Sequence, residues 1–126
     1  MVVPAAVREA LAAHAHAELP NEACGLLVID GDAVVRYEPA RNISPSPWYF
    51  ELEFDPERWM DLWDEGYELG IFHSHVSSDP RPSRTDVEHI GQWQGRPYFI
   101  LNVRTGELAG WTIRDGSIEP LPLEAA

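Results

Sequence analysis

Cysteine is almost absent from this sequence, which contains only Cys24. A single cysteine cannot form an internal disulfide, and it excludes a zinc site built from four thiolates. Such scarcity is typical of proteins that work in a reducing compartment. We therefore expect a cytoplasmic protein whose fold does not depend on disulfides.

Basic side chains are also few, with 9 arginines and lysines against 21 aspartates and glutamates, which gives a formal charge of −12. No cluster of positive charge follows one stretch of the chain, as phosphate neutralisation would require. This charge balance argues against nucleic acid and against an anionic membrane surface as partners.

Long apolar runs are missing, and none approaches the length needed to cross a bilayer. The first residues, Met1 to Pro4, lack the basic and apolar regions of a secretory signal. A chain of 126 residues is the size of one ordinary domain. We expect a single domain over residues 1–126, with no membrane-spanning segment.

Apolar periodicity and turn residues predict three helices and seven strands. The helices fall in residues 4–18, from 55 to near Gly66 or Gly70, and in 83–90. The strands fall in residues 24–30, 33–38, 48–54, 71–75, 97–103, 108–113 and around 118–121, with a loop at 39–47. This order predicts an α/β fold of the α+β type, with a mixed, mostly antiparallel sheet flanked by about three helices.

Two His-x-His pairs occur, and their settings differ. His73 and His75 lie in a predicted strand, where alternate side chains share one face, so both imidazoles can bind the same metal ion. His14 and His16 lie in a predicted helix, where residues two apart do not face each other. We interpret that second pair as solvent-exposed side chains.

Asp86 is the candidate for a third ligand. A catalytic zinc ion takes three protein ligands and leaves a fourth position for water. The seven residues between His75 and Ser83 are enough to bring the chain back over the end of the strand. Ser83-x-x-Asp86 is also a common helix-capping pattern, so each of these two side chains has a purely structural alternative.

A hydrolytic zinc site also needs a base, and Glu22 is the best placed carboxylate. It lies where a polar loop enters the buried strand that starts at Cys24, so its side chain is expected near the core. Cys24 itself could be a nucleophile. An apolar strand would raise its pKa and leave it inert, and a catalytic cysteine also needs a nearby activating base.

Together these residues resemble the complete JAMM signature of the MPN-domain metallopeptidases: Glu22, then His73-Ser74-His75, then Ser83 and Asp86 after seven residues. The resemblance spans about residues 7–114. The residues Glu22-Ala23-Cys24-Gly25 and the stretch from Asn42 to Tyr49 are similar to small bacterial members of the family. Those members release cysteine from the C-terminal glycine of a ubiquitin-like sulfur-carrier protein.

The resemblance implies a role for each residue of the signature. His73, His75 and Asp86 would bind one Zn²⁺, Glu22 would take a proton from water and pass it to the leaving amine, and Ser83 would donate a hydrogen bond to the oxyanion. Ser74 points to the opposite face of the strand and would support it. The implied partner is a ubiquitin-like sulfur carrier ending in Gly-Gly, whose tail we expect at the sheet edge near Tyr49–Phe54.

Alternative functions remain open at this point. The chain could be a non-catalytic MPN scaffold, or a deconjugase of the same family that removes ubiquitin-like modifiers from protein lysines. A zinc deaminase would need His-x-Glu and Pro-Cys-x-x-Cys, which this sequence lacks. The sequence does not identify the carrier or the oligomeric state, a homodimer included.

Overall fold

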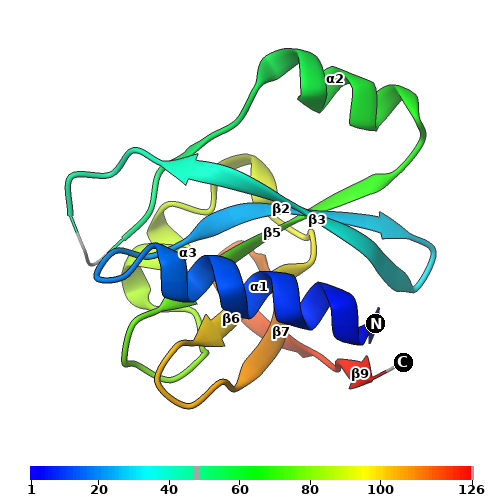
Figure 1. Cartoon of the computed structure of the whole chain (residues 1–126). Helices are drawn as coiled ribbons and strands as arrows, with labels where there is room; N and C mark the ends of the chain where they lie inside the picture. The colour runs from blue at the N-terminus through cyan, green and yellow to red at the C-terminus, as the bar shows by residue number, and fades with distance from the viewer. Residues whose placement is uncertain (47–48, 126) are drawn as a thin grey trace.

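A twisted β-sheet runs through the computed structural model, which describes residues 1–46 and 49–125 (Figure 1). The strands within these residues are β1 (Val2–Val3), β2 (Cys24–Asp30), β3 (Ala33–Asn42), β4 (Leu52–Glu53), β5 (Glu68–His75), β6 (Tyr98–Asn102), β7 (Leu108–Arg114), β8 (Ser117–Leu121) and β9 (Glu124–Ala125). The helices are α1 (Ala5–Ala17), α2 (Pro56–Asp64) and α3 (Arg84–Glu88), followed by a 3₁₀ turn at Gly91–Trp93.

The sheet has the strand order β8-β7-β6-β5-β2-β3-β1-β9, and β4 pairs with β3 outside this order. β5 pairs antiparallel with β2 and parallel with β6. β1 also pairs in parallel, with β3 and with β9, while the remaining ladders are antiparallel. The predicted α+β fold with a mixed sheet is confirmed.

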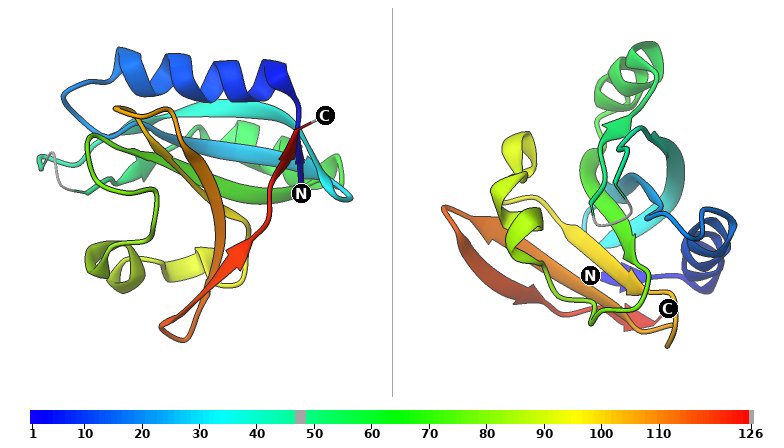
Figure 2. Two further views of the ribbon diagram at one scale, coloured as in Figure 1. Left: turned by 90° about the horizontal axis from the view of Figure 1, so that it is seen from below. Right: turned by 90° about the vertical axis from the view of Figure 1, so that its left-hand side faces the viewer.

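One face of the sheet is covered by α1 (Figure 2). Val7, Leu11 and Ala15 are the buried residues of this helix, and their spacing of four places them on one side. They pack in the same apolar cluster as Leu27 and Ile29 of β2. The helix lacks a side-chain cap at Pro4, so this packing is its main source of stability.

The opposite face carries α2 and the 3₁₀ turn. Leu26 and Val28 alternate with the residues under α1 and belong to a second apolar cluster, which also contains Leu62 of α2 and Trp93. Asp55 caps α2 by accepting a hydrogen bond from the Glu57 backbone N–H at 3.0 Å. β5 therefore crosses the middle of the sheet between two apolar layers.

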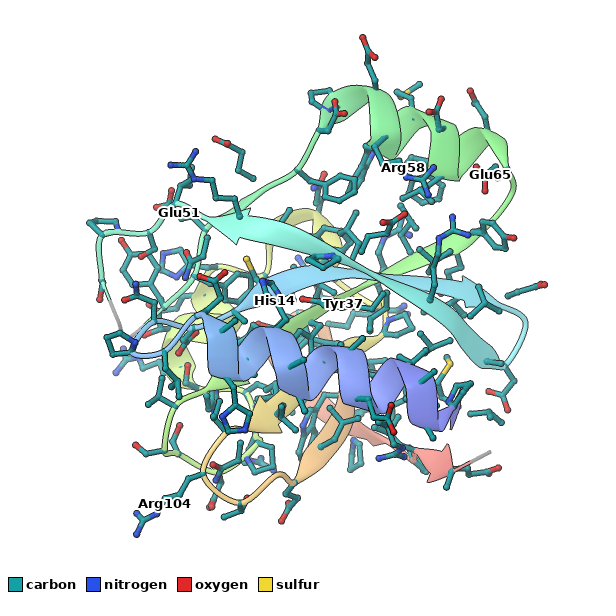
Figure 3. The ribbon with its side chains drawn as sticks, viewed as in Figure 1. His14, Tyr37, Glu51, Arg58, Glu65 and Arg104 are labelled. Carbon is teal, nitrogen blue, oxygen red and sulfur yellow. The ribbon has the colours of Figure 1, made fainter. Side chains whose placement is uncertain are left out.

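His14 corrects one expectation from the sequence. His16 is exposed as expected, but His14 is half-buried and its Nδ1 lies 2.7 Å from the hydroxyl oxygen of Tyr37 in β3. Figure 3 shows the two side chains close together between α1 and the sheet. The helix turns His14 toward β3, where the Tyr37 hydroxyl needs a partner because the residue is buried.

An ion network fastens α2 to β3. Arg58 donates hydrogen bonds to the carboxylate of Glu38, one of them from Nε at 2.9 Å, and Arg36 lies 3.5 Å from Glu65. Arg58 and Glu65 both lie on the side of α2 nearest the sheet in Figure 3. α2 is thus held on the sheet by these ion pairs and by the buried side chain of Leu62.

Three strand predictions were wrong in extent. The strand expected at 48–54 is only Leu52–Glu53, and Trp48 lies outside the described residues. β3 continues through Pro39 to Asn42, although residues 39–47 were expected to be a loop, because Pro39 pairs with Gly25 of β2 and extends the ladder. β5 begins at Glu68 rather than Ile71.

The two ends of the chain meet at one edge of the sheet, an arrangement that the sequence did not indicate. Val2 and Val3 of β1 pair with Glu124 and Ala125 of β9. Among the described residues, the helices are all too short or too polar to span a bilayer.

Candidate metal centre

β5 presents two imidazoles at its carboxyl end. His73 and His75 project from the same face of the strand, and their ring centroids are 4.9 Å apart. Both are buried, His73 completely. β2 and β6 flank this end of the strand, with His73 paired opposite Cys24 and Ile100, so the two histidines sit on a rigid part of the sheet.

A loop anchored to the sheet brings Asp86 back to these histidines. The carbonyl of Pro80 accepts a hydrogen bond from the indole N–H of Trp111 at 2.7 Å, which fixes the middle of the loop. The carbonyl of Asp79 lies 2.8 Å from Nδ1 of His75. α3 then starts at Arg84 and carries Asp86 in its first turn, buried against the strand.

The three side chains are spaced as zinc ligands are. Oδ2 of Asp86 lies 3.3 Å from Nε2 of His73 and 3.1 Å from Nε2 of His75, and the three ligand atoms all lie within 4.8 Å of one another. Two ligands at about 2.0 Å from a tetrahedral ion are separated by about 3.3 Å. Two imidazoles and one carboxylate, with room for water, are also a common donor set for catalytic zinc.

The protonation of the site suits a metal. Nδ1 of His75 faces the Asp79 carbonyl, so a neutral ring that donates from Nδ1 has the lone pair of Nε2 free for a metal ion. Both ring nitrogens of His73 are buried without a hydrogen bond among the described residues. Buried nitrogens without partners are costly in a core, and a bound cation would satisfy one of them.

Burial and hydrogen bonding act against each other on the pKa values of the ligands. Burial alone would lower the pKa of His75, but its hydrogen bonds to Asp86 and Asp79 raise it. Burial would raise the pKa of Asp86, but the two histidines and the Ser83 N–H hold it well below its usual range. Asp86 is therefore an anion, as a metal ligand must be.

Glu22 enters the site from the turn that leads into β2. It is 5% exposed, and its Oε1 is buried without a hydrogen bond among the described residues. Burial raises its pKa, an effect that the nearby His73 and His75 oppose. A carboxylate whose pKa is raised above its usual value binds a proton more readily, which suits a residue that accepts a proton and returns it.

Ser83 and Asp86 cap α3 as well as line the site. The Ser83 hydroxyl oxygen accepts from the Asp86 N–H at 3.1 Å, and Oδ2 of Asp86 accepts from the Ser83 N–H at 2.8 Å. The capping role that the sequence left open is therefore present for both residues, and their functional roles stay predictions. Since its oxygen is the acceptor in this contact, the Ser83 O–H can still donate outward to a ligand.

Two hollows adjoin the ligands. One, of about 370 Å³, is lined by Glu22, His75 and Ser83 together with Pro20, Ser77 and Thr85. The other, of about 390 Å³, runs past Asp86 and Thr85 and is walled by Tyr49, Phe50 and Leu52. The residues of the signature thus lie close together, with two hollows beside them.

The sequence placed Phe50 at the expected tail position but did not indicate its contact with His73, and it gave Asn42 no role in the site. Phe50 stacks on His73, and the side-chain amide of Asn42 donates to the carbonyl oxygen of Glu22 at 2.8 Å. Ser74 was expected to support the strand, and its Oγ accepts a hydrogen bond from the Ala23 N–H at 2.8 Å. These contacts link distant segments, so local spacing could not have indicated them.

Cys24 lies beside the site but is not part of it. The thiol is fully buried, and burial raises its pKa to about 12. A thiol with such a pKa is not a nucleophile at neutral pH. This geometry agrees with the inert role expected from the sequence.

Comparison with known proteins agrees with this geometry. The family model for prokaryotic homologs of the JAB domain matches residues 4–114. The CysO-cysteine peptidase of Mycobacterium tuberculosis is 31% identical over 132 aligned residues, covering 98% of this chain and 89% of that protein. The desampylase of Haloferax volcanii is 35% identical over 107 aligned residues, covering 75% of each.

Solved structures show the same architecture. The protein DSY2949 from Desulfitobacterium hafniense superposes with a TM-score of 0.81 at 29% identity, covering all of this chain and 93% of that one. AF2198, a JAB1/MPN domain protein from Archaeoglobus fulgidus, has the same fold with a TM-score of 0.69 at 19% identity, covering 99% and 98%. From its fold, its site and these relatives, the chain belongs to the prokaryotic JAB family of MPN-fold, JAMM-type proteins.

Proposed function

We propose that this protein is a zinc-dependent peptidase that hydrolyses the bond after the C-terminal glycine of a ubiquitin-like sulfur-carrier protein, releasing cysteine from a carrier–cysteine adduct. The observation that carries the proposal is the cluster of His73, His75 and Asp86 with the buried carboxylate of Glu22, whose Oε1 has no hydrogen bond among the described residues. A metallopeptidase needs at least a set of metal ligands and a base beside them.

His73, His75 and Asp86 are the residues that would hold the zinc ion. When bound there, zinc polarises the scissile carbonyl and lowers the pKa of water to roughly 7. The Asp79 carbonyl keeps His75 in the correct tautomer, and the Ser83 N–H keeps Asp86 oriented. These contacts preorganise the donor atoms before any ion arrives.

Glu22 and Ser83 carry the proton and charge changes of the reaction. Glu22 accepts a proton from the attacking water and returns it to the departing amine, which places the leaving group in the hollow that Glu22 lines. The Ser83 O–H donates to the carbonyl oxygen as it becomes negative, a contact worth about 3 kcal/mol in comparable sites.

The second hollow suits an extended carrier tail. Its wall from Tyr49 to Leu52 leads to β4, which pairs with β3 along one side. A tail ending in Gly-Gly could run past Phe50 to the metal, because glycine has no side chain to meet the aromatic wall. This supports the expected tail position near Tyr49–Phe54.

The relatives support a ubiquitin-like partner and a second candidate reaction. One group is named for peptidase action on a CysO–cysteine adduct and another for desampylase activity, so removal of a ubiquitin-like modifier from protein lysine is the second candidate. The coverage of the first group, 98% of this chain, favours the carrier–cysteine adduct. A role in cysteine biosynthesis in the cytoplasm stays a prediction.

The test is mass spectrometry of a carrier–cysteine adduct incubated with the zinc-loaded protein. We expect loss of one cysteine from the adduct, none after chelation, and a loss of activity of at least a thousandfold in Glu22→Gln with one zinc per chain retained. Glu9→Gln, on the exposed side of α1, is the matched control and should remain active.

Other outcomes select the alternatives. Cleavage of a carrier–lysine isopeptide but not of the cysteine adduct would identify a deconjugase. A protein that binds no zinc and cleaves neither substrate would instead be a non-catalytic scaffold of the same fold.

A further inference from the structure

Asn42 has an unusual position at the end of β3, where both ends of its side-chain amide are in use. Nδ2 donates to the carbonyl oxygen of Glu22 at 2.8 Å. Oδ1 accepts from the backbone N–H groups of Ser44 at 2.9 Å and Glu51 at 3.0 Å. Since two N–H groups require an oxygen and a carbonyl requires an N–H, the chemistry of the partners fixes the orientation of the amide.

The two acceptor contacts tie residues 43–46 to residues 49–51, which are the described parts of the loop 43–51. Ile43 donates its backbone N–H to the Glu51 carbonyl at 2.9 Å, directly beside them. Tyr49 stacks on His89 and Phe50 stacks on His73, with ring centroids 5.6 and 4.5 Å apart. The loop closed by Asn42 is therefore the one that forms the aromatic wall of the site.

The hydrogen bond that Nδ2 of Asn42 donates holds the part of the site that contains Glu22. Among the described residues no hydrogen bond reaches the buried Oε1 of Glu22, so the position of this carboxylate depends on its backbone. That backbone is held by Asn42 at the Glu22 carbonyl, and by Ser74, which pairs with both the N–H and the carbonyl of Ala23.

We infer that Asn42 is a positioning residue that couples the loop 43–51 to the carboxylate of Glu22. The inference rests on the proposed function for its catalytic consequence. The planar amide of Asn42 fixes the distance between the aromatic wall, where the carrier tail is expected, and the Glu22 carboxylate. Occupation of the wall by the tail thereby steadies the base, so binding energy from a non-reacting part of the substrate acts on the chemical step.

Two substitutions distinguish the role of the donor Nδ2 of Asn42 from the role of its acceptor Oδ1. Asn42→Asp keeps an oxygen for Ser44 and Glu51 but replaces the donor to Glu22 with a second oxygen. Asn42→Ala removes both ends without adding charge. Ser44→Ala is the matched control, because it removes only the hydroxyl contacts with Ser46 inside the loop and keeps the backbone bond to Asn42.

Steady-state kinetics on the carrier–cysteine adduct should split accordingly, with one zinc per chain in every variant. In Asn42→Asp we expect kcat to fall at least tenfold with KM within twofold of wild type. In Asn42→Ala kcat should fall at least tenfold and KM should rise at least threefold, while Ser44→Ala stays within twofold for both. A kcat within twofold of wild type in Asn42→Asp, or loss of zinc from it, would overturn the inference.

Amide hydrogen exchange tests the coupling without activity. In Asn42→Asp the Ala23 amide should exchange at least tenfold faster while Ser44 and Glu51 stay protected, and in Asn42→Ala all three should accelerate. An unchanged Ala23 amide in both variants would also overturn the coupling. If the wild-type protein cleaves no adduct, the proposed function fails and the exchange experiment still decides whether Asn42 holds both segments.

Discussion

Phe50 lies against the imidazole of His73, with ring centroids 4.5 Å apart and planes inclined by 24°. Tyr98 meets the same imidazole edge-on at 5.3 Å. These two rings enclose the histidine, which is fully buried. An imidazole packed in this way has one ring orientation, and its surroundings exclude water from that side of the site.

The Phe50 contact predicts a substrate-binding effect. Phe50→Ala should raise KM for the carrier–cysteine adduct about tenfold, since a buried aromatic contact is worth on the order of 1–2 kcal/mol. Zinc content should be unchanged, because the side chain donates no ligand. Met60→Ala is the control, as Met60 of α2 lines a separate hollow outside the expected tail position. Equal KM values for wild type and Phe50→Ala would place the tail elsewhere.

The metal centre predicts stabilisation by zinc. At a zinc concentration a hundredfold above Kd, binding adds about 2.7 kcal/mol to the free energy of unfolding, so chelation should lower Tm by roughly 10 °C. Asp86→Asn should abolish this difference, because it removes the anionic ligand. Calorimetry measures Tm with and without chelator, and metal analysis measures the zinc content of each protein.

Ser83→Ala separates the helix cap from the ligand set. It should cost about 1 kcal/mol through loss of the bond to the Asp86 N–H, yet keep the zinc-dependent rise in Tm. Loss of zinc from Ser83→Ala, or an identical Tm with and without chelator in the wild type, would contradict the assignment of the site.

The local parts of the site followed from the sequence. Strand alternation correctly placed His73 and His75 on one face, and the capping pattern placed Asp86 in the first turn of a helix. The turn before β2 likewise placed Glu22 near the core. In each case the residue types and their spacing decide the local geometry, and the sheet only completes it.

Long-range contacts explain what the sequence did not indicate. Tyr49 and Phe50 have strong strand propensity, but they lie outside the ladder, where they stack on His89 and His73 and are partly buried. Gly70 suggested the end of a helix, yet it lies inside β5, where a Cβ would come within 2.6 Å of the Pro97 carbonyl oxygen. Both outcomes depend on segments more than fifteen residues away.

The burial of Cys24 predicts that its thiol is unreactive in the native protein. With a pKa of about 12 in the folded state, against about 9 when unfolded, the thiol stays protonated in the native protein at pH 8–9. Iodoacetamide at pH 8.5 should therefore modify no cysteine in the native protein and one in denaturant, as mass spectrometry would show. Rapid native modification, or loss of adduct cleavage in Cys24→Ala, would reopen the nucleophile alternative.

The contact between His14 and Tyr37 predicts a purely structural effect on the other side of the sheet. Tyr37→Phe removes the hydroxyl that lies 2.7 Å from His14 and leaves the ring packed edge-on against Phe72. The free energy of unfolding should fall by about 1 kcal/mol, the net value of one such hydrogen bond.

The same variant tests whether the two faces of the sheet act independently. Tyr37 belongs to the apolar cluster under α1, whereas His73 and its neighbours face the opposite layer, so zinc content and kcat should match wild type. His14→Ala should destabilise similarly, and the double variant should cost little more than either single change, because both remove one shared interaction. A fall in kcat larger than the loss of folded protein would show that α1 also positions the site.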